Sequence, residues 1–253
     1  MPIELKDVSY SYGKHEAVKH VTFTANRGDL VAVLGPNGAG KSTLFQCMLG
    51  LLRGYKGEID ICHKNIRTLS RAQLSRMAAY IPQSAEPVFN YTVFDTVLMG
   101  TTGGMGLLKT PGQAQTDAAD AALRTLGIEE LAQRGIGTLS GGERQLVLIA
   151  RAMAQNAKIL IMDEPTANLD YGNQQRVLER IRDLAAQGYT VLLSTHNPEH
   201  AFRYATHVLA LQQGSAVACG KTQDTLTAEL IEQLYGVKVK LTDTDPRTFV
   251  PIE

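Results

Sequence analysis

The sequence predicts an α/β protein with a mainly parallel sheet, and two observations lead to this class. The runs at 30–34, 159–162 and 191–194 are apolar almost throughout, which is typical of strands that are covered on both faces. Amphipathic helical patterns occur at 145–155 and 173–186. Because strands and helices alternate along the chain, parallel pairing through crossover helices is favoured.

Composition is that of an ordinary globular protein. The 253 residues include 25 Lys and Arg against 25 Asp and Glu, and 44% of them are hydrophobic. This balance excludes a disordered, collagen-like or coiled-coil chain, and a net charge of zero predicts no broad nucleic-acid binding. No apolar run approaches the roughly 18 residues of a membrane span, and the start at 1–4 predicts no signal peptide. Three widely spaced cysteines predict neither a disulfide framework nor a zinc ribbon.

Different parts of the chain carry different periodicities. Residues 3–10 and 18–24 alternate between apolar and polar, which predicts a half-exposed antiparallel sheet near the N-terminus. The segment 92–155 has helical periodicity and little strand signal. We therefore expect one domain over 1–253, with an α/β core and antiparallel β subdomain formed by 1–91 and 156–253 and a helical subdomain inserted at 92–155.

A phosphate-binding loop is the first chemical motif. Residues 35–42 read GPNGAGKS and fit the pattern G-x-x-x-x-G-K-[ST], between an apolar strand and a helix predicted from about Lys41 to Leu51. Small residues let backbone N–H groups face an anion, and the helix N-terminus adds partial positive charge. Lys41 can reach the β- and γ-phosphates, and the Ser42 hydroxyl can bind Mg²⁺. A glycine turn without a ligand is the alternative, but by chance the pattern arises in only about one chain in a hundred of this size.

A pair of acids follows the strand at 159–162. Asp163 and Glu164 thus lie at the carboxyl end of a buried parallel strand, where α/β sheets bind their ligands. Asp163 can hold Mg²⁺ through water, and Glu164 can act as a general base on an attacking water. An acidic turn that caps the next helix would be the better interpretation of this pair alone. Together with the phosphate loop, the pair indicates nucleotide hydrolysis.

A second glycine motif, LSGGE, occupies 139–143 and precedes a helical pattern. Ser140 and Glu143 fit a capping box, so one interpretation is a helix cap worth roughly 1 kcal/mol. The other is a second helix N-terminus that is open to a phosphate. One chain is not expected to bring both glycine motifs to the same nucleotide, whereas two head-to-tail copies can.

The order of the motifs GPNGAGKST, LSGGE, ILIMDE and STH resembles that of the ATP-binding subunit of an ABC transporter. The resemblance covers roughly residues 3 to 240. It implies a P-loop NTPase core, ATP and Mg²⁺ as cofactors, and ATP hydrolysis coupled to transmembrane transport.

The resemblance also implies roles for individual residues. Tyr12 would stack on adenine, and the phosphates would be wrapped by Gly35, Pro36, Asn37, Gly38, Ala39, Gly40, Lys41, Ser42 and Thr43. Metal ligands would be Ser42, Gln83 and Asp163. Catalytic roles fall to Glu164, His196 and Lys41. The signature that closes over the partner's ATP would be Ser140, Gly141, Gly142 and Glu143, and Asp170 would contact the opposite subunit.

Alone, several of these residues would carry no functional meaning. Tyr12 would be an ordinary strand-end tyrosine, Gln83 a loop residue and His196 an unremarkable imidazole. The chain has Ala167-Asn168 in the loop that leads to Asp170, where the family often has Ser-Ala, and this is a mild departure.

Three segments are similar to importers of iron–siderophore, haem and cobalamin: 92–100, 169–174 and 230–237. One departure lies at 100–104, where that group usually has Gly-Arg-x-Pro-His and this chain has Gly-Thr-Thr-Gly-Gly. Molybdate or zinc importers, exporters and soluble non-transport ABC ATPases stay as alternatives.

The resemblance implies a homodimer, two membrane-spanning permease subunits and a periplasmic or extracellular substrate-binding protein. It places the chain peripherally on the cytoplasmic face of the inner membrane, without a nucleic-acid partner.

Overall fold

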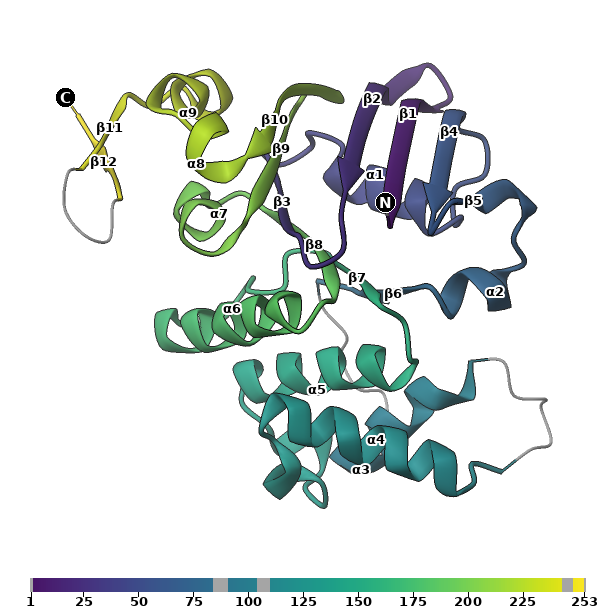
Figure 1. Ribbon diagram of the computed structural model, residues 1–253. Coiled ribbons are helices and arrows are strands. Elements are labelled where there is room, and N and C mark those ends of the chain that lie inside the picture. The colour runs from purple at the N-terminus through teal and green to yellow at the C-terminus, as the bar shows by residue number, and fades with distance from the viewer. Residues whose placement is uncertain (1, 84–90, 104–109, 243–247, 253) are drawn as a thin grey trace.

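The computed structural model describes residues 2–83, 91–103, 110–242 and 248–252 (Figure 1). The strands are β1 Ile3–Tyr12, β2 His15–Ala25, β3 Leu30–Leu34, β4 Lys56–Ile61, β5 Lys64–Asn65, β6 Ala78–Ile81, β7 Ile159–Met162, β8 Thr190–Thr195, β9 His207–Gln212, β10 Ser215–Lys221, β11 Val239–Leu241 and β12 Phe249–Pro251. The α-helices are α1 Lys41–Met48, α2 Arg71–Ser75, α3 Val93–Leu98, α4 Gln113–Leu126, α5 Gly141–Ala154, α6 Tyr171–Ala186, α7 Pro198–Tyr204, α8 Thr222–Thr225 and α9 Ala228–Tyr235. Short 3₁₀ helices are η1 Ile66–Thr68, η2 Met99–Thr102, η3 Glu129–Leu131 and η4 Ile136–Thr138.

The centre of the fold is a parallel sheet. Strands β9, β3, β8, β7 and β6 lie side by side in that order, and each adjacent pair is parallel. All residues of β3, β7 and β8 are buried. The sequences of β3 and β7 are apolar throughout, and β8 has an apolar centre at 191–193, as expected for strands that are covered on both faces. The predicted α/β class with a mainly parallel sheet is confirmed.

An antiparallel sheet adjoins the parallel one. Strand β1 pairs with β2 on one side and β4 on the other, and a single parallel bridge between Lys19 and Ser215 links β2 to β10. The helix α1 packs between the two sheets, since Phe45 and Met48 belong to one core cluster with residues of β1 and of β3. Because α1 ends at Met48, it is shorter than the predicted helix to Leu51.

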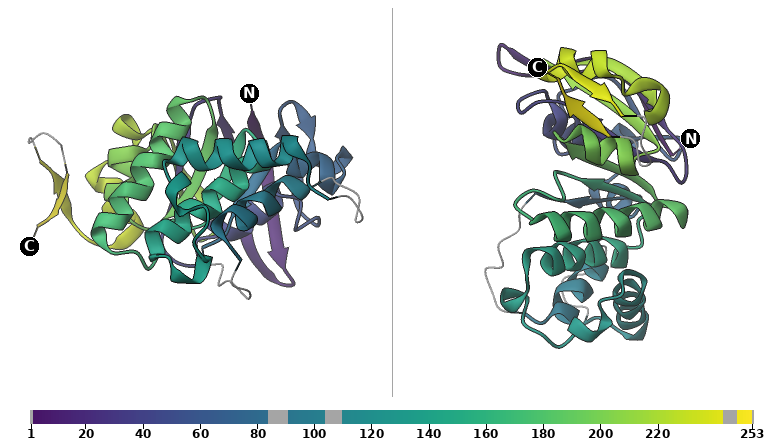
Figure 2. Two further views of the ribbon diagram at one scale, coloured as in Figure 1. Left: turned by 90° about the horizontal axis from the view of Figure 1, so that it is seen from below. Right: turned by 90° about the vertical axis from the view of Figure 1, so that its left-hand side faces the viewer.

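The helices α3, α4 and α5 form a separate lobe below the sheets (Figure 2). Their apolar faces share a core cluster with α6 and with the other face of the parallel sheet. The described part of 92–155 contains helices and only one isolated bridge, between Thr92 and Gly135. The exact division at 92 and 155 stays a prediction. Of the sequence departure at 100–104, residue 104 lies outside the described residues.

Within the described residues, no helix combines the length and apolar character that a membrane crossing requires.

Candidate active site

The phosphate loop connects the end of β3 to the start of α1. Gly40 is the N-cap of α1, has a φ of 100° and provides no side-chain cap. A Cβ atom there would lie 2.3 Å from the carbonyl oxygen of Ala17, and one at Gly35 would lie 2.2 Å from that of Leu211. Both distances are far below a van der Waals contact, so the loop requires glycine at these two positions.

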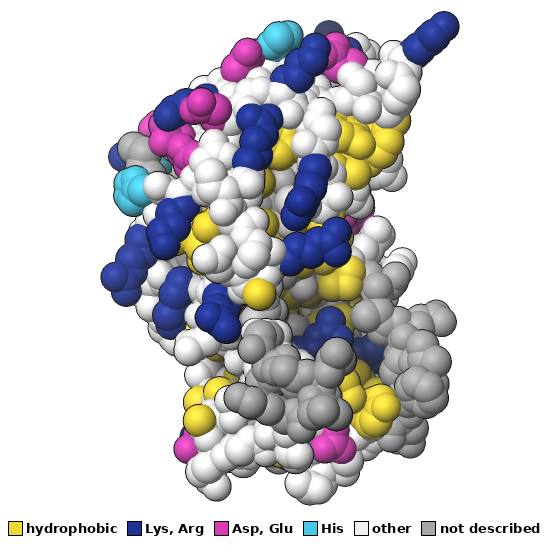
Figure 3. Space-filling view, turned by 90° about the vertical axis from the view of Figure 1, so that its right-hand side faces the viewer, with side chains coloured by type: hydrophobic (Ala, Val, Ile, Leu, Met, Phe, Trp, Pro, Cys, Tyr) yellow, Lys and Arg dark blue, Asp and Glu magenta, His cyan; other side chains and the backbone are white. Residues whose placement is uncertain are grey.

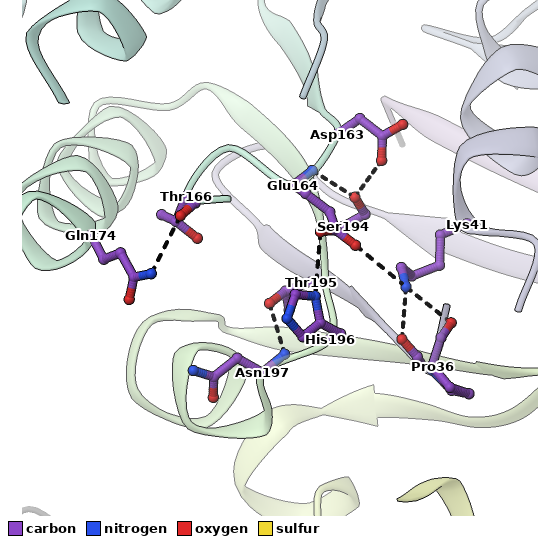
Figure 4. A network of polar contacts seen from close by, with 11 residues as sticks. Pro36, Lys41, Asp163, Glu164, Thr166, Gln174, Ser194, Thr195, His196 and Asn197 are labelled. Carbon is purple, nitrogen blue, oxygen red and sulfur yellow. Dashed lines mark hydrogen bonds and ion pairs between the residues drawn. The ribbon is translucent and has the colours of Figure 1, made fainter. Parts of the chain in front are cut away.

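Lys41 is folded back onto this loop. Its Nζ atom donates to the carbonyl oxygens of Gly35 at 2.7 Å and of Pro36 at 3.1 Å. It also lies 3.8 Å from Oε1 of Glu164 (Figure 4). Burial lowers the pKa of Lys41, while the neighbouring carboxylate of Glu164 opposes that shift. The ammonium group is therefore held at the centre of the loop by acceptors that a bound phosphate can replace.

Asp163 and Glu164 follow β7 and are fixed by the neighbouring strands. Ser194, in β8, accepts a hydrogen bond from the backbone N–H of Glu164 at 2.8 Å and donates one to Oδ1 of Asp163 at 2.6 Å. Tyr80, in β6, donates to Oδ2 of Asp163 at 3.4 Å. Glu164 has a φ of 43°, an unfavourable value for a residue with a side chain, and strain of this kind clusters at functional sites.

His196 follows β8 and faces the same carboxylate. Its Nδ1 lies 3.3 Å from Oε2 of Glu164, so Glu164 stands between His196 and Lys41 (Figure 4). The His196 side chain is 58% exposed, whereas that of Glu164 is 15% exposed. The Glu164 carboxylate is thus held beside the phosphate loop, between the exposed His196 and the buried Lys41.

A cavity of about 460 Å³ opens over the loop. Its lining includes Tyr12, Lys41, Ser42, Gln83 and Glu164. This volume is within the roughly 300–1,000 Å³ of small-molecule sites. A second cavity of about 370 Å³ shares Asn37, Gln83 and Glu164 with the first and adds His196.

Tyr12 lines the first cavity. The residue is 48% exposed, and its ring makes an edge-to-face contact with that of Tyr10, with 5.0 Å between the ring centres. The Tyr12 hydroxyl donates to Oε1 of Gln46 at 3.4 Å. The structure therefore gathers at one place the predicted adenine-stacking, phosphate-binding and catalytic residues, although their roles stay predictions.

The signature residues do not line either cavity. Ser140 caps α5, with its Oγ accepting from the N–H of Glu143 at 3.3 Å and the Glu143 carboxylate accepting from the N–H of Ser140 at 2.8 Å. A Cβ at Gly142 would lie 2.6 Å from Oδ1 of Asn173, so the start of α5 presses directly against α6.

Asp170, the predicted dimer contact, caps α6. Its carboxylate accepts from the N–H and from the side-chain amide of Asn173, both at 2.8 Å. These hydrogen bonds lower the pKa of Asp170, with the backbone bond as the largest cause. Asn168, two residues before Asp170, lines the second cavity and has a φ of 61°.

Comparison with known proteins identifies the family. The model of the ABC transporter family matches residues 18–167. The chain belongs to the ABC transporter family. An uncharacterized ABC transporter ATP-binding protein of Haemophilus influenzae is 40% identical over 95% of this chain and 92% of its own length.

Two further comparisons concern metal transport. A probable iron chelatin transport ATP-binding protein of Helicobacter pylori is 35% identical over 95% of both chains. A solved metal-chelate type ABC transporter in an inward-facing conformation matches with a TM-score of 0.87 and 33% identity, over 100% of this chain and 97% of that chain. Other relatives are named for manganese and for cobalamin transport. This ABC protein is an ATPase, and the predicted family and P-loop NTPase fold are confirmed.

The ABC family implies Mg²⁺, and the oxygen atoms present fit that ion. Ser42 and Gln83 line the first cavity, whereas Asp163 is not among its lining residues and has both carboxylate oxygens hydrogen-bonded. Mg²⁺ keeps several waters and takes one or two carboxylates, so Asp163 suits a water-mediated contact.

Sequence reasoning did not assign roles to Ser194 and Tyr80. Both act through Asp163, and burial with Asp163 raises the pKa of Tyr80 to about 12, which keeps its phenol a hydrogen-bond donor. Ser194 directly follows the apolar residues 191–193 and lies two positions before His196, and this was the available signal.

Proposed function

We propose that this chain is the ATP-hydrolysing subunit that powers an importer of a metal chelate and works as a head-to-tail homodimer. The observation that carries the proposal is the separation of two anion-binding helix ends. The start of α1 opens on the first cavity, whereas the start of α5 lies on neither cavity wall. A second copy of the chain can place the start of its α5 against the first cavity.

ATP binding begins at the phosphate loop. Adenine stacks on Tyr12, and the backbone amides of 35–43 surround the phosphates at the positive end of α1. Lys41 exchanges its hydrogen bonds to Gly35 and Pro36 for the β- and γ-phosphates. Ser42, Gln83 and, through water, Asp163 would hold Mg²⁺, which would supply positive charge to neutralise the phosphates.

Glu164 accepts the proton of the attacking water. Its carboxylate lies at the junction of both cavities, and its backbone is fixed by Ser194. His196, 3.3 Å from that carboxylate, orients it and contacts the γ-phosphate. A positioned base of this kind contributes about 10²–10⁴ to a rate.

The second copy closes the site. Ser140, Gly141 and Gly142 at the start of its α5 approach the γ-phosphate from the opposite side, and Glu143 fixes Ser140 through the capping box. Asp170 lies at the contact between the copies. ATP thus favours the closed dimer. Loss of the γ-phosphate removes the contact that joins the two copies, so ATP has different affinities for the closed and the open state.

The ATPase dimer works with two membrane-spanning permease subunits and a periplasmic or extracellular substrate-binding protein, on the cytoplasmic face of the inner membrane. The names of the Helicobacter pylori relative and of the similar solved transporter support a metal chelate as cargo.

A mixing experiment tests the arrangement between copies. Ser140→Arg blocks the signature of one chain, and Lys41→Ala blocks the phosphate loop of the other. Each variant alone is expected to lack ATPase activity, while an equimolar mixture forms heterodimers that keep one intact composite site. Phosphate release measured over a range of mixing ratios gives the result, and a mixture as inactive as its components would contradict the proposal.

Uptake measurements test the cargo. A deletion strain is supplied with radiolabelled ferric siderophores, haem, cobalamin, molybdate or Mn²⁺, and is complemented with the wild type or with Glu164→Gln. Loss of uptake of one chelate, restored only by the wild type, supports the proposal. Loss of Mn²⁺ uptake alone would assign the chain to the manganese group that one relative is named for.

A further inference from the structure

Two tyrosines, Tyr55 and Tyr235, have a buried hydroxyl group that meets no hydrogen-bond partner in the part of the chain that the structure describes. Such groups are uncommon in folded proteins, because the hydrogen bond that is lost to water is not replaced. Tyr55 directly precedes β4, and the side of the molecule that carries β4, β5 and α2 displays many Lys and Arg side chains (Figure 3). Tyr235 is the last residue of α9, and its surroundings are different.

The end of α9 is fastened beside the phosphate loop. The side-chain amide of Gln212, the last residue of β9, donates to the carbonyl oxygen of Gln233 at 2.8 Å. The preceding residue of β9, Leu211, has its carbonyl oxygen against Gly35, where the phosphate loop begins. The Tyr235 ring packs against the core cluster beneath the parallel sheet. One strand end therefore carries both the start of the phosphate loop and the end of α9.

Two groups of the active site act on the Tyr235 hydroxyl. Burial raises the pKa of Tyr235 most, the charge of Glu164 raises it further, and the backbone N–H of Gly35 lowers it. That N–H makes only a long hydrogen bond, of 3.4 Å, to the carbonyl oxygen of Thr195. A phenol can donate one hydrogen bond and accept another at the same oxygen. The Tyr235 hydroxyl can thus serve the N–H of Gly35 and the carboxylate of Glu164 together.

The contacts of Glu164 change when the phosphate loop is filled. Here its carboxylate oxygens face Lys41 at 3.8 Å and His196 at 3.3 Å. Under the proposed function, Lys41 turns to the phosphates, so Glu164 loses one of these two neighbours. A buried carboxylate that loses a positive neighbour needs another donor, because water is not there to replace it. The Tyr235 hydroxyl is a neutral donor that is already buried nearby and has no other use for its proton.

We propose that Tyr235 is a positioning residue for ATP hydrolysis, whose hydroxyl accepts from the N–H of Gly35 and donates to the carboxylate of Glu164 once ATP has drawn Lys41 away. The proposal rests on the proposed function, since it needs Glu164 as the base. Tyr235 acts through Glu164 and does not touch the nucleotide. Its hydroxyl links the filled loop to the base, so that the carboxylate is held towards the attacking water only when ATP is present.

Tyr235→Phe removes only the hydroxyl group, and Tyr55→Phe is its matched control. We measure kcat and KM for ATP, and the Tm without nucleotide, on the isolated subunit. For Tyr235→Phe we expect kcat to fall about tenfold while KM stays within about twofold, because the hydrogen bond forms only after ATP has bound. The Tm should stay level or rise, because a buried group without a partner is removed. A merely structural role would lower the Tm instead.

The control should leave kcat unchanged, since Tyr55 lies against the guanidinium group of Arg67 and not against Glu164. An unchanged kcat in Tyr235→Phe would overturn the proposal, and so would equal losses of kcat in the two variants.

A double-mutant cycle tests whether Tyr235 acts through Glu164. In a Glu164→Gln background, Tyr235→Phe should lower the rate by less than about twofold, because no base is left to position. A full tenfold loss in that background would overturn the proposal. An unchanged rate in Glu164→Gln alone would refute the proposed function and the positioning role together. A slow Glu164→Gln beside a normal Tyr235→Phe would refute the positioning role and leave the proposed function standing.

Two replacements at position 235 complete the test. With para-aminophenylalanine, which restores an N–H donor at the same place, kcat should recover to within about threefold of the wild type. Recovery no better than that of Tyr235→Phe would contradict the proposal. With meta-fluorotyrosine, the fluorine resonance should shift when a nonhydrolysable ATP analogue saturates the subunit, because the hydroxyl gains partners. No shift would overturn the proposal, and this measurement keeps the hydroxyl, so it holds even if Tyr235→Phe does not fold.

Discussion

The N-termini of α1 and α5 are both glycine-containing helix starts, but they differ in how their backbone amides are satisfied. Gly40 caps α1 without any side-chain hydrogen bond, and the loop before it surrounds the buried Lys41. Ser140 and Glu143 cap α5 reciprocally, at an exposed position. The first end lines one of the two cavities at the site, and the second lines neither of them.

The difference supports the proposed order of contacts, in which the nucleotide meets α1 before it meets the α5 of a second copy. The first turn of α1 contains no acidic residue and no side-chain cap, so its backbone amides are available to an anion. At α5, the box already satisfies two of the four terminal amides, which stabilises the helix by roughly 1 kcal/mol without any ligand. An uncapped end suits primary binding, and a capped end suits a second contact made only when two copies meet.

Glu164→Gln is expected to have the largest effect and tests the α1 side. The change removes the proton acceptor but keeps the size of the side chain, so the ATP hydrolysis rate should fall by about 10²–10⁴ while the Kd for ATP changes little. Phosphate release and size-exclusion chromatography with ATP measure the rate and the trapped dimer. An unchanged hydrolysis rate would remove Glu164 from its proposed role.

Gly40→Ala tests whether the uncapped end depends on its close backbone approach. The new Cβ would lie 2.3 Å from the Ala17 carbonyl oxygen at a φ of 100°, so the loop must shift. Strain of about 1–3 kcal/mol predicts roughly a tenfold to hundredfold weaker Kd for ATP.

Gly38→Ala is the matched control for that loop. Its φ is 79°, but nothing lies within 4 Å of the new Cβ. A smaller loss of ATP affinity is expected, measured by the same titration. If both variants lose affinity equally, the requirement for glycine at position 40 comes from its positive φ and not from its contact with Ala17.

Gly142→Ala addresses the α5 side. The added Cβ would lie 2.6 Å from Oδ1 and 2.9 Å from Cβ of Asn173, which pushes α5 away from α6. We expect a several-fold lower ATPase rate, because the signature must be placed accurately. Asn173→Gly removes the clashing atoms, so the double variant should recover to the rate of Asn173→Gly alone. A double variant as slow as Gly142→Ala would indicate that the methyl group obstructs the phosphate instead.

The smallest effect concerns the pH dependence of the α5 cap. Hydrogen bonds with the backbone and then the side chain of Ser140 lower the pKa of Glu143 from its usual 4.5. A carboxyl with a lowered folded-state pKa stabilises the fold above its unfolded pKa, and this contribution is lost as pH falls through the folded pKa.

Glu143→Ala should therefore lower the Tm by about 2–4 °C at pH 7, with a gap that narrows below about pH 4.5. Calorimetry over a pH series measures the gap. Glu130→Ala, at an exposed position with no cap, serves as the control and should show a small, constant difference. A Glu143→Ala gap that stays constant down to pH 3 would show that the box does not depend on the ionised carboxyl.

Much of the architecture could be predicted from local patterns. Apolar runs located β3, β7 and the centre of β8, and alternation located β1 and β2, because burial on one or two faces determines those patterns. The strand β6 was not predicted. Its four residues are too few to show a period, and two of them are alanines with weak strand preference.

Those parts of the candidate site that are contiguous in the sequence could be predicted. Gly35 to Thr43 and Asp163-Glu164 are each set by one strand-to-loop junction. The support of Asp163 by Tyr80 and Ser194 depends on the strand order β6, β7, β8, which joins residues more than 80 and more than 30 positions apart. The cavity lined by residues around the end of α1, η1 and α2 likewise arises from segments that only the folded chain brings together.

The helix α1 has one consequence for communication across the molecule. Its eight residues span roughly 12 Å, and it is clamped between two sheets. Lys41 stands at one end, and Leu49 and Gly50, just beyond the other end, line a cavity together with residues of η1 and α2. Because a short helix packed on both sides moves as one body, we expect a shift of the phosphate loop on nucleotide binding to displace the wall of that cavity as well.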